Sequence, residues 1–187
     1  MEIEKVLTAL RSREPKTLNG EHFKPAAVLV PIQEKKDGHH IVLTRRALGL
    51  NSHGGQIAFP GGRLDPTDAG PLEAALRESQ EEVGIDPRDV RVLGQLDQVT
   101  AAANFLVTPF VGRIPFPYDF SLNPSETTEV FSVPVSALLK ADIMSVDTTQ
   151  KSASRPVYHF QYRHWDIWGA TAKVIKQLLE LAYEHKV

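Results

Sequence analysis

Hydrophobic residues recur along this chain with two periods, and each period predicts a different kind of element. Near the start, four apolar residues recur at helical spacing and predict a short opening helix: Ile3, Val6, Leu7 and Leu10. An apolar run at 26–32 predicts a buried strand, 41–46 predicts the strand that returns beside it, and the turn residues 35–40 between them predict a hairpin. Three further stretches have the composition of strands: 90–99, 105–114 and 154–163.

The clearest helix is predicted over 71–83, because Pro71 suits a first helical turn and Gly84 suits a helix end. One stripe of this helix is suited to packing, formed by Leu72, Leu76, Ser79 and Val83. The pattern also predicts a strand that runs into a short helix at 129–139, and an amphipathic final helix at 167–185. Hairpins mixed with helices favour an α+β sandwich with a mixed sheet over a doubly wound parallel one.

Length and composition narrow the class of protein. A chain of 187 residues without a Pro/Gly/Ser-rich linker predicts one domain over 1–187, with 1–24 as an opening helix and lead-in. The absence of cysteine excludes a disulfide scaffold, a cysteine zinc site and a thiol nucleophile. A net charge of −2 and the lack of a long apolar segment give no reason to expect a nucleic-acid or membrane partner. The acidic N-terminus is unlike a signal peptide, so we expect a cytoplasmic protein.

The predicted helix 71–83 carries a group of carboxylates. Glu78, Glu81 and Glu82 are three and four residues apart, so they project from one side, where like charges repel by a few tenths of a kcal/mol per pair. A bound cation would remove that repulsion, and carboxylate oxygens suit Mg²⁺. The alternative is a solvated surface helix in which Arg77 pairs with Glu73 and Glu81.

The residues before this helix make a chance arrangement improbable. Phe59-Pro60-Gly61-Gly62 precedes it by about ten residues, and paired glycines permit positive φ and leave the backbone unobstructed. The segment 61–85 as a whole resembles the Nudix box, in which a glycine precedes the pattern Arg-Glu-x-x-Glu-Glu-x-Gly. Seven positions match: Gly62, Arg77, Glu78, Glu81, Glu82, Gly84 and Ile85. Three features depart from the box: one extra residue between Gly62 and Arg77, Asp68 in place of the first Glu, and Ser79 in place of an aliphatic residue.

A second motif, at 43–63, resembles the signature that precedes the box in coenzyme A diphosphatases of the Nudix superfamily. Its matching positions are Leu43, Thr44, Arg46, Leu50, His53, Gly55, Ile57 and Phe59 to Gly62. Ala47 and Asn51 replace a serine and an arginine of that signature. The segment 167–173 also looks like this group, so the resemblance runs from about residue 26 to 182.

The resemblance implies a Nudix-type α/β/α sandwich and a hydrolase that depends on Mg²⁺ or Mn²⁺. It implies Glu78 and Glu82 as metal ligands, with the carbonyl of Gly61 as an additional donor. Glu81 is then a further ligand or the catalytic base. Glu126 lies where this subfamily often places a catalytic acid, although a loop glutamate beside a strand is the alternative.

For substrate binding the resemblance favours three residues that flank the glycine-rich segment: Arg46, His53 and Arg63. Arginine suits phosphate because its planar fork forms paired, charge-assisted hydrogen bonds. The alternatives are that Arg46 ends a strand at the surface and that His53 only hydrogen-bonds within a loop. Trp165 and Trp168 are expected in the core or as a hydrophobic wall.

The implied substrate is coenzyme A or acyl-CoA. Two alternatives stay open: another nucleoside diphosphate derivative, such as ADP-ribose or a dinucleotide, and a catalytically silent Nudix domain that senses a ligand. The intact Glu78, Glu81 and Glu82 count against a silent domain. The sequence leaves a homodimer open.

Overall fold

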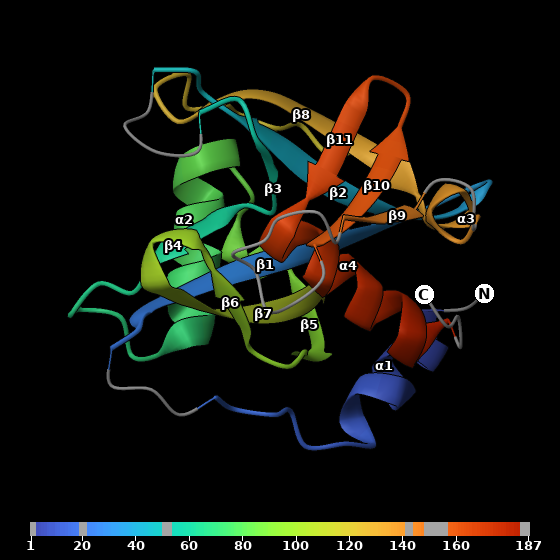
Figure 1. Cartoon of the computed structure of the whole chain (residues 1–187), viewed down its shortest axis with the longest axis horizontal. Coiled ribbons are helices and arrows are strands. Elements are labelled where there is room, and N and C mark those ends of the chain that lie inside the picture. The colour runs from blue at the N-terminus through green and yellow to red at the C-terminus, as the bar shows by residue number, and fades with distance from the viewer. Residues whose placement is uncertain (1–2, 19–21, 50–53, 141–143, 148–156, 184–187) are drawn as a thin grey trace.

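A mixed sheet forms the centre of the fold (Figure 1). The computed structural model describes residues 3–18, 22–49, 54–140, 144–147 and 157–183. The strand order is β3-β2-β1-β7-β5, and β4, β6 and β8 pair with β1, β7 and β2. Within the described part of the chain, β1 and β7 run parallel, and the other paired strands of this sheet run antiparallel. The strands are β1 (Lys24–Lys35), β2 (Gly38–Arg46), β3 (Ile57–Ala58), β4 (Gly61–Arg63), β5 (Arg91–Gln95), β6 (Val99–Ala101), β7 (Phe105–Arg113) and β8 (Thr127–Pro134).

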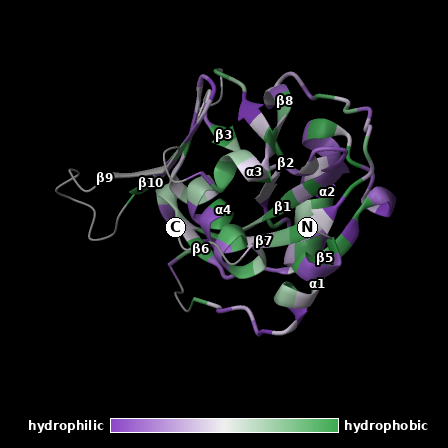
Figure 2. Ribbon diagram, turned by 90° about the vertical axis from the view of Figure 1, so that its right-hand side faces the viewer, coloured by the Kyte–Doolittle hydropathy of each residue, from purple (hydrophilic) through white to green (hydrophobic). Residues whose placement is uncertain are grey.

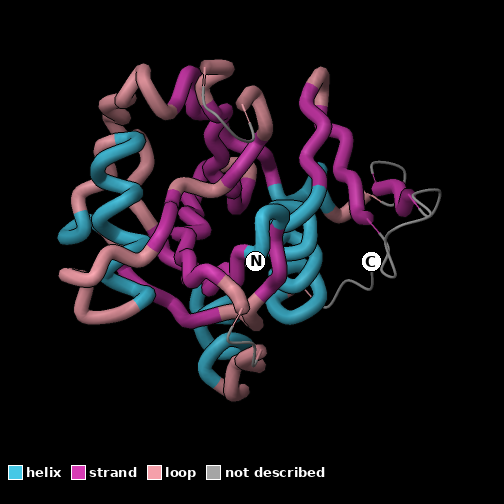
Figure 3. Tube along the Cα trace, turned by 60° about the vertical axis from the view of Figure 1, so that its left-hand side comes forward, coloured by secondary structure: helices cyan, strands magenta, loops and turns pink. Residues whose placement is uncertain are grey.

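Helices cover the two faces of this sheet, so the molecule is layered α/β/α (Figures 1 and 3). Helix α2 lies on one face, and α1 and α4 lie on the other. A small antiparallel sheet, in the order β11-β10-β9, lies beside α4. The remaining elements are α1 (Ile3–Arg11), α2 (Pro71–Val83), η1 (Pro87–Asp89), η2 (Ala102–Asn104), α3 (Val135–Leu138), β9 (Met144–Asp147), β10 (Val157–Tyr162), β11 (Trp165–Trp168) and α4 (Gly169–Ala182).

The core is divided by the sheet. The larger part lies between the sheet and α1 and α4, where all four predicted apolar residues of α1 are buried. The smaller part lies under α2, and the central strands are largely hydrophobic in Figure 2. The predicted α+β sandwich with a mixed sheet is therefore confirmed.

The bounds predicted for the helix at 71–83 are also confirmed. Pro71 begins α2, and Gly84 ends it at φ 73° while its N–H donates to the carbonyl of Gln80. The predicted packing stripe is confirmed: Ser79 and Val83 are buried, and Leu72 and Leu76 are half-buried but pack against the core. The buried apolar residues of α2 are Ala74, Ala75 and Val83, and small alanines let the helix approach β1 closely.

Three other predicted elements need correction. The final helix begins at Gly169 rather than at 167, because Ile167 and Trp168 end strand β11. The stretch 90–99 is interrupted between β5 and β6, and the stretch 47–70, predicted as loop, contains the short strands β3 and β4. No helix in the described residues is long and apolar enough to cross a membrane.

Candidate active site

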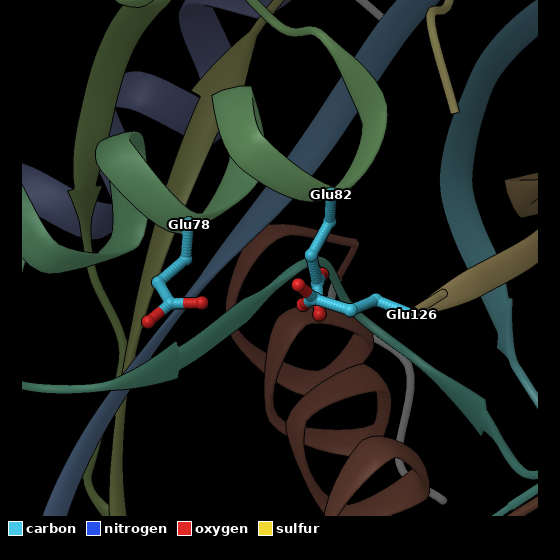
Figure 4. A group of neighbouring side chains, drawn as sticks. All are labelled: Glu78, Glu82 and Glu126. Atoms are coloured by element: carbon cyan, nitrogen blue, oxygen red, sulfur yellow. The ribbon is translucent and has the colours of Figure 1, made fainter. Parts of the chain in front are cut away.

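Three glutamates from two parts of the chain converge beside strand β4 (Figure 4). Glu78 and Glu82 lie one turn apart on α2, and Glu126 immediately precedes β8. A carboxylate oxygen of each lies within 4.8 Å of those of the other two. We call these three residues the carboxylate cluster.

The loop before β8 is fastened to α2, which positions Glu126. The backbone N–H of Asn123 donates to the carbonyl of Glu82 (2.9 Å), and the side-chain amide of Asn123 donates to Glu126 Oε1 (3.1 Å). The carbonyl of Glu126 accepts from the N–H of Ala47 at the end of β2 (2.8 Å). Glu126 is therefore held between α2 and β2.

Glu82 is the most enclosed of the three, with an exposed fraction of only 3%. Its Oε2 accepts from the N–H of Gly61 (3.1 Å), and its Oε1 lies 3.6 Å from Nη1 of Arg46. Burial raises the pKa of Glu82 to about 7, against the opposing effects of the Gly61 N–H and Arg46. Burial also raises the pKa of Glu78. The alternative of a solvated surface helix therefore does not hold at Glu82, because β4 packs over it.

The two glycines of β4 allow this close approach. A Cβ at Gly62 would lie 2.4 Å from Cδ of Glu78, and a Cβ at Gly61 would lie 2.3 Å from the carbonyl oxygen of Ala27. Gly61 also has a φ of 146°, which L side chains rarely adopt. The paired glycines therefore have a steric role at the cluster as well as a conformational one.

Arg77 organises the rim of the site. Its guanidinium forms a forked pair with Asp68, at 2.9 Å from Nε and 3.0 Å from Nη2. The same guanidinium donates to Glu78 (3.1 Å) and Glu81 (3.2 Å). Its hydrogen bonds lower the pKa of Asp68. Asp68 thus reaches Arg77 in spite of the extra residue in this loop.

Two other glutamates of α2 lie outside the cluster. The side chain of Glu81 is 54% exposed, and its carboxylate is paired with Arg77. The alternative reading paired Glu73 with Arg77, but the carboxylate of Glu73 accepts instead from the N–H of Ala69, just before the helix. Of the three glutamates in the Nudix-box resemblance, Glu78 and Glu82 lie in the carboxylate cluster and Glu81 does not. The third member of the cluster is Glu126.

A cavity of about 530 Å³ adjoins the cluster. Arg46, Gly61, Gly62 and Arg63 line it on the side of the cluster. The Nε atom of Arg46 is buried without a hydrogen-bond partner, so this side chain has unused capacity to donate. Arg63 is exposed. Two of the three predicted substrate-binding residues are thus brought together, and His53 lies outside the described residues.

The far wall of the cavity was not predicted as a binding surface. It is formed by Phe105 and by the junction of β11 and α4, including Trp168 and Lys173. The segment 167–173, which resembles the coenzyme A diphosphatases, was the available sequence signal. Trp165 lies in the core, as expected, whereas Trp168 is a cavity wall.

The raised pKa of Glu82 predicts how the free energy of unfolding of the metal-free protein depends on pH. Because its folded-state pKa of about 7 exceeds the ordinary glutamate pKa of 4.5, the folded protein holds a proton that the unfolded chain releases between these pH values. Its contribution to the free energy of unfolding is therefore present below pH 4.5 and is lost as pH rises through 7, by up to about 3 kcal/mol. Glu82→Gln should stabilise the protein at pH 8, and this gain should shrink towards pH 5.

Urea unfolding in EDTA at both pH values measures this difference. Comparison with wild type at each pH removes the contributions of the other titrating groups. An equal effect of Glu82→Gln at pH 5 and pH 8 would contradict a raised pKa.

The fold and the site together define an α+β sandwich with a cluster of three carboxylates beside a glycine-rich strand. The family model described as NUDIX domain matches residues 22–152, which is more than half of the chain. The chain belongs to this family and is a Nudix pyrophosphohydrolase.

Its relatives include proteins named Nudix hydrolase NudL. The protein of Photorhabdus laumondii is 41% identical over 167 residues, which cover 89% of this chain and 88% of the relative. The protein of Salmonella dublin is 40% identical over 164 residues, covering 87% and 83% of the two chains. These matches extend well beyond the segment 61–85.

Solved structures agree on the fold. A Nudix hydrolase from M. smegmatis, RenU, superimposes with a TM-score of 0.52 at 24% identity, over 67% of this chain and 76% of that one. An Ap4A hydrolase from C. elegans gives a TM-score of 0.52 at 20% identity, over 59% and 80% of the two chains. Both likenesses concern the fold alone.

Proposed function

We propose that this Nudix hydrolase cleaves the diphosphate of coenzyme A or acyl-CoA, releasing 3′,5′-ADP and 4′-phosphopantetheine or its acyl derivative. The observation that carries the proposal is the position of the described residues of the segment 43–63, which resembles the coenzyme A diphosphatase signature. It contributes Arg46, Gly61, Gly62 and Arg63 to the cavity that adjoins the carboxylate cluster. The residues of the resemblance therefore lie where a diphosphate and its substituents would be bound.

The carboxylate cluster fits a divalent cation. Its donors are all oxygens, which suit Mg²⁺ or Mn²⁺, and the raised pKa values of Glu78 and Glu82 reflect negative charge that is buried without enough compensation. Glu78 and Glu82 would hold the ion, with the carbonyl of Gly61 as an additional donor. When bound, such an ion lowers the pKa of a water and offsets the charge of the diphosphate.

The chain also offers candidates for the catalytic base. We assign this role to Glu126, because the Asn123 amide orients its carboxylate towards the other two members of the cluster. Glu81 is assigned as a further ligand at the rim, where it already holds Arg77. In the reaction, water adds to one phosphorus, the bridging oxygen leaves with the other, and the base takes the proton of the water.

Arg46 and Arg63 are assigned to the phosphates of the substrate. Each is a strong hydrogen-bond donor on the cavity wall, and a guanidinium can bind two phosphate oxygens at once. Arg46, beside Glu82, is placed to contact the diphosphate. Arg63, at the exposed end of β4, is placed to contact a phosphate farther from the cluster.

A second candidate substrate is another nucleoside diphosphate derivative, such as ADP-ribose or a dinucleotide. It is favoured by the two departures from the signature, Ala47 and Asn51. Ala47 directly follows Arg46, a proposed substrate-binding residue at the end of β2, and Asn51 lies outside the described residues.

Product analysis by mass spectrometry decides between the candidates. The panel is coenzyme A, acetyl-CoA, dephospho-CoA, ADP-ribose and a dinucleotide, each with Mg²⁺, with Mn²⁺ and with EDTA. We expect 3′,5′-ADP and 4′-phosphopantetheine from coenzyme A at the highest rate, and no turnover in EDTA. A higher kcat/KM for ADP-ribose or the dinucleotide would replace the first proposal with the second.

A further inference from the structure

We propose that Trp168, backed by His159, is a stacking platform for the nucleobase of the substrate, so that the nucleotide half occupies the cavity. This inference rests on the proposed function and deepens it by assigning the half of the substrate that the cavity takes. The ligand class is a purine nucleotide that carries a phosphate besides its diphosphate.

Trp168 is an anomaly for a packed protein, because it is 40% exposed while it lines a cavity. Alternation along β11 explains its direction: Trp165 and Ile167 are buried, and Asp166 and Trp168 face outward. Gly169, at φ 66°, then turns the chain into α4. An exposed indole on a cavity wall is typical of a surface that a ligand covers.

The indole of Trp168 is also held in place. The ring of His159 stacks on it with an interplanar angle of 11° and a centroid distance of 6.2 Å. The Nδ1 atom of His159 is in turn hydrogen-bonded to both carboxylate oxygens of Asp166, at 3.0 and 3.1 Å. Both contacts cross the β10–β11 hairpin, so the platform is built by the pairing of His159 with Trp168.

The same cavity also contains a second aromatic ring, that of Phe105, with positive charge beside it. The guanidinium of Arg63 lies 5.1 Å from the ring centroid of Phe105, and Nζ of Lys24 lies 5.8 Å from it. The Nζ of Lys173 contacts the carbonyl of Thr100 at 3.5 Å. The cavity therefore combines flat rings with cations, which matches a base that carries phosphate.

The cavity lies next to the carboxylate cluster: Gly62 lines it and adjoins Glu78, and Arg46 lines it with Nη1 3.6 Å from Glu82 Oε1. A substrate with its diphosphate at the cluster can thus extend one of its halves into the cavity. In coenzyme A only the nucleotide half has a flat aromatic ring, whereas the pantetheine half is a flexible chain without one. Stacking on Trp168 therefore selects the nucleotide half.

The chain supplies a matched control on the same strand. Trp165 lies three positions before Trp168 and faces the core, where it stacks on Phe131 at 5.0 Å and 16°. These two residues are the only tryptophans of the chain. Trp165→Phe leaves Trp168 as the sole fluorescent indole, and Trp168→Leu leaves Trp165.

Fluorescence titration in EDTA tests the platform without any turnover. For Trp165→Phe we expect saturable quenching by 3′,5′-ADP and none by 4′-phosphopantetheine, because only the first has a base to stack. For Trp168→Leu we expect no quenching by either ligand. Quenching of Trp165→Phe by 4′-phosphopantetheine alone, or by neither ligand, would overturn the proposal.

Calorimetry and kinetics extend the test to variants that lack the indole of Trp168. Trp168→Leu should weaken 3′,5′-ADP binding by about tenfold or more and raise the KM of coenzyme A similarly, with little change in kcat. Trp168→Phe, which keeps a ring, should recover most of the affinity. A Trp168→Leu variant that is folded and binds like Trp165→Phe would contradict the platform.

The outcomes also separate this inference from the proposed function. Hydrolysis of coenzyme A without quenching of Trp168 by 3′,5′-ADP would overturn the platform and leave the proposed function intact. Quenching by 3′,5′-ADP in a protein that does not hydrolyse coenzyme A would support the platform and overturn the proposed substrate.

Discussion

Glu82→Gln is expected to lower kcat by about a thousandfold or more at saturating Mg²⁺, while the protein stays folded. The substitution removes the charge of the most buried member of the carboxylate cluster but keeps an oxygen that can accept from the Gly61 N–H. A thousandfold loss corresponds to ~4 kcal/mol of transition-state stabilisation, which is a reasonable effect for a group that holds an essential cation. Glu78→Gln should behave in the same way.

Glu73→Gln is the matched control on the same helix. Glu73 is exposed at the first turn of α2, where its carboxylate accepts from the N–H of Ala69, and a glutamine can still accept there. This variant should keep wild-type kcat. Steady-state rates over a Mg²⁺ titration, with the fold checked by circular dichroism, measure all three variants. Wild-type activity of Glu82→Gln at any Mg²⁺ concentration would exclude Glu82 as a metal ligand.

Mg²⁺ binding itself gives a readout that needs no turnover. In the wild type, Mg²⁺ should raise the thermal midpoint at pH 8, because the ion binds the folded state and compensates the buried charge. Glu82→Gln should show little or no such rise. The same shift in both proteins would place the ion elsewhere.

The sequence was sufficient to predict helix α2 and its two ends. Pro71 and Gly84 act locally, through the backbone conformations that they permit, so their effect does not depend on the rest of the fold. Which side chains of α2 are buried depends on β1 and β4, which pack against it. Helical spacing alone therefore underestimated the burial of Glu82.

Only part of the candidate site could be predicted from local sequence, as was true of helix α2. Glu78 and Glu82 lie within one local motif, and their spacing on a helix brings them together. Glu126 reaches them only because Asn123 and Ala47 tie its loop to α2 and β2, which no local pattern encodes. It could be proposed from the resemblance alone, and its place in the cluster required the tertiary structure.

The far wall of the cavity shows why a single strong motif is an incomplete guide to a site. Trp168 follows Gly61 and Gly62 by more than a hundred residues, yet all three line one cavity. Its role depends on β11 pairing with β10 and on the position of α4 beside the main sheet. The local sequence around Trp168 predicted a continuous helix and so concealed the outward-facing position.

Dephospho-CoA should be a poorer substrate than coenzyme A by about 10- to 100-fold in kcat/KM, because the cavity wall carries positive charge. The two substrates differ only in the 3′-phosphate of the nucleotide half. A charge-assisted hydrogen bond contributes roughly 1.5–3 kcal/mol, and each 1.4 kcal/mol is a factor of ten. Arg63 is the best-placed reader of this phosphate, because it is exposed at the end of β4 and lies over Phe105.

Arg63→Gln should therefore lower the rate with coenzyme A and bring it close to the rate with dephospho-CoA. Arg46→Gln should lower both rates, because Arg46 lies beside Glu82 and is assigned to the diphosphate common to both substrates. Arg91→Gln serves as the matched control, since Arg91 is a half-exposed arginine that pairs with Glu4 and is not part of the cavity wall. Acyl groups on the thiol should change the rates less, because they lie on the half that the cavity does not take. Equal kcat/KM values for coenzyme A and dephospho-CoA in the wild type would remove the 3′-phosphate from recognition and favour a broader diphosphohydrolase.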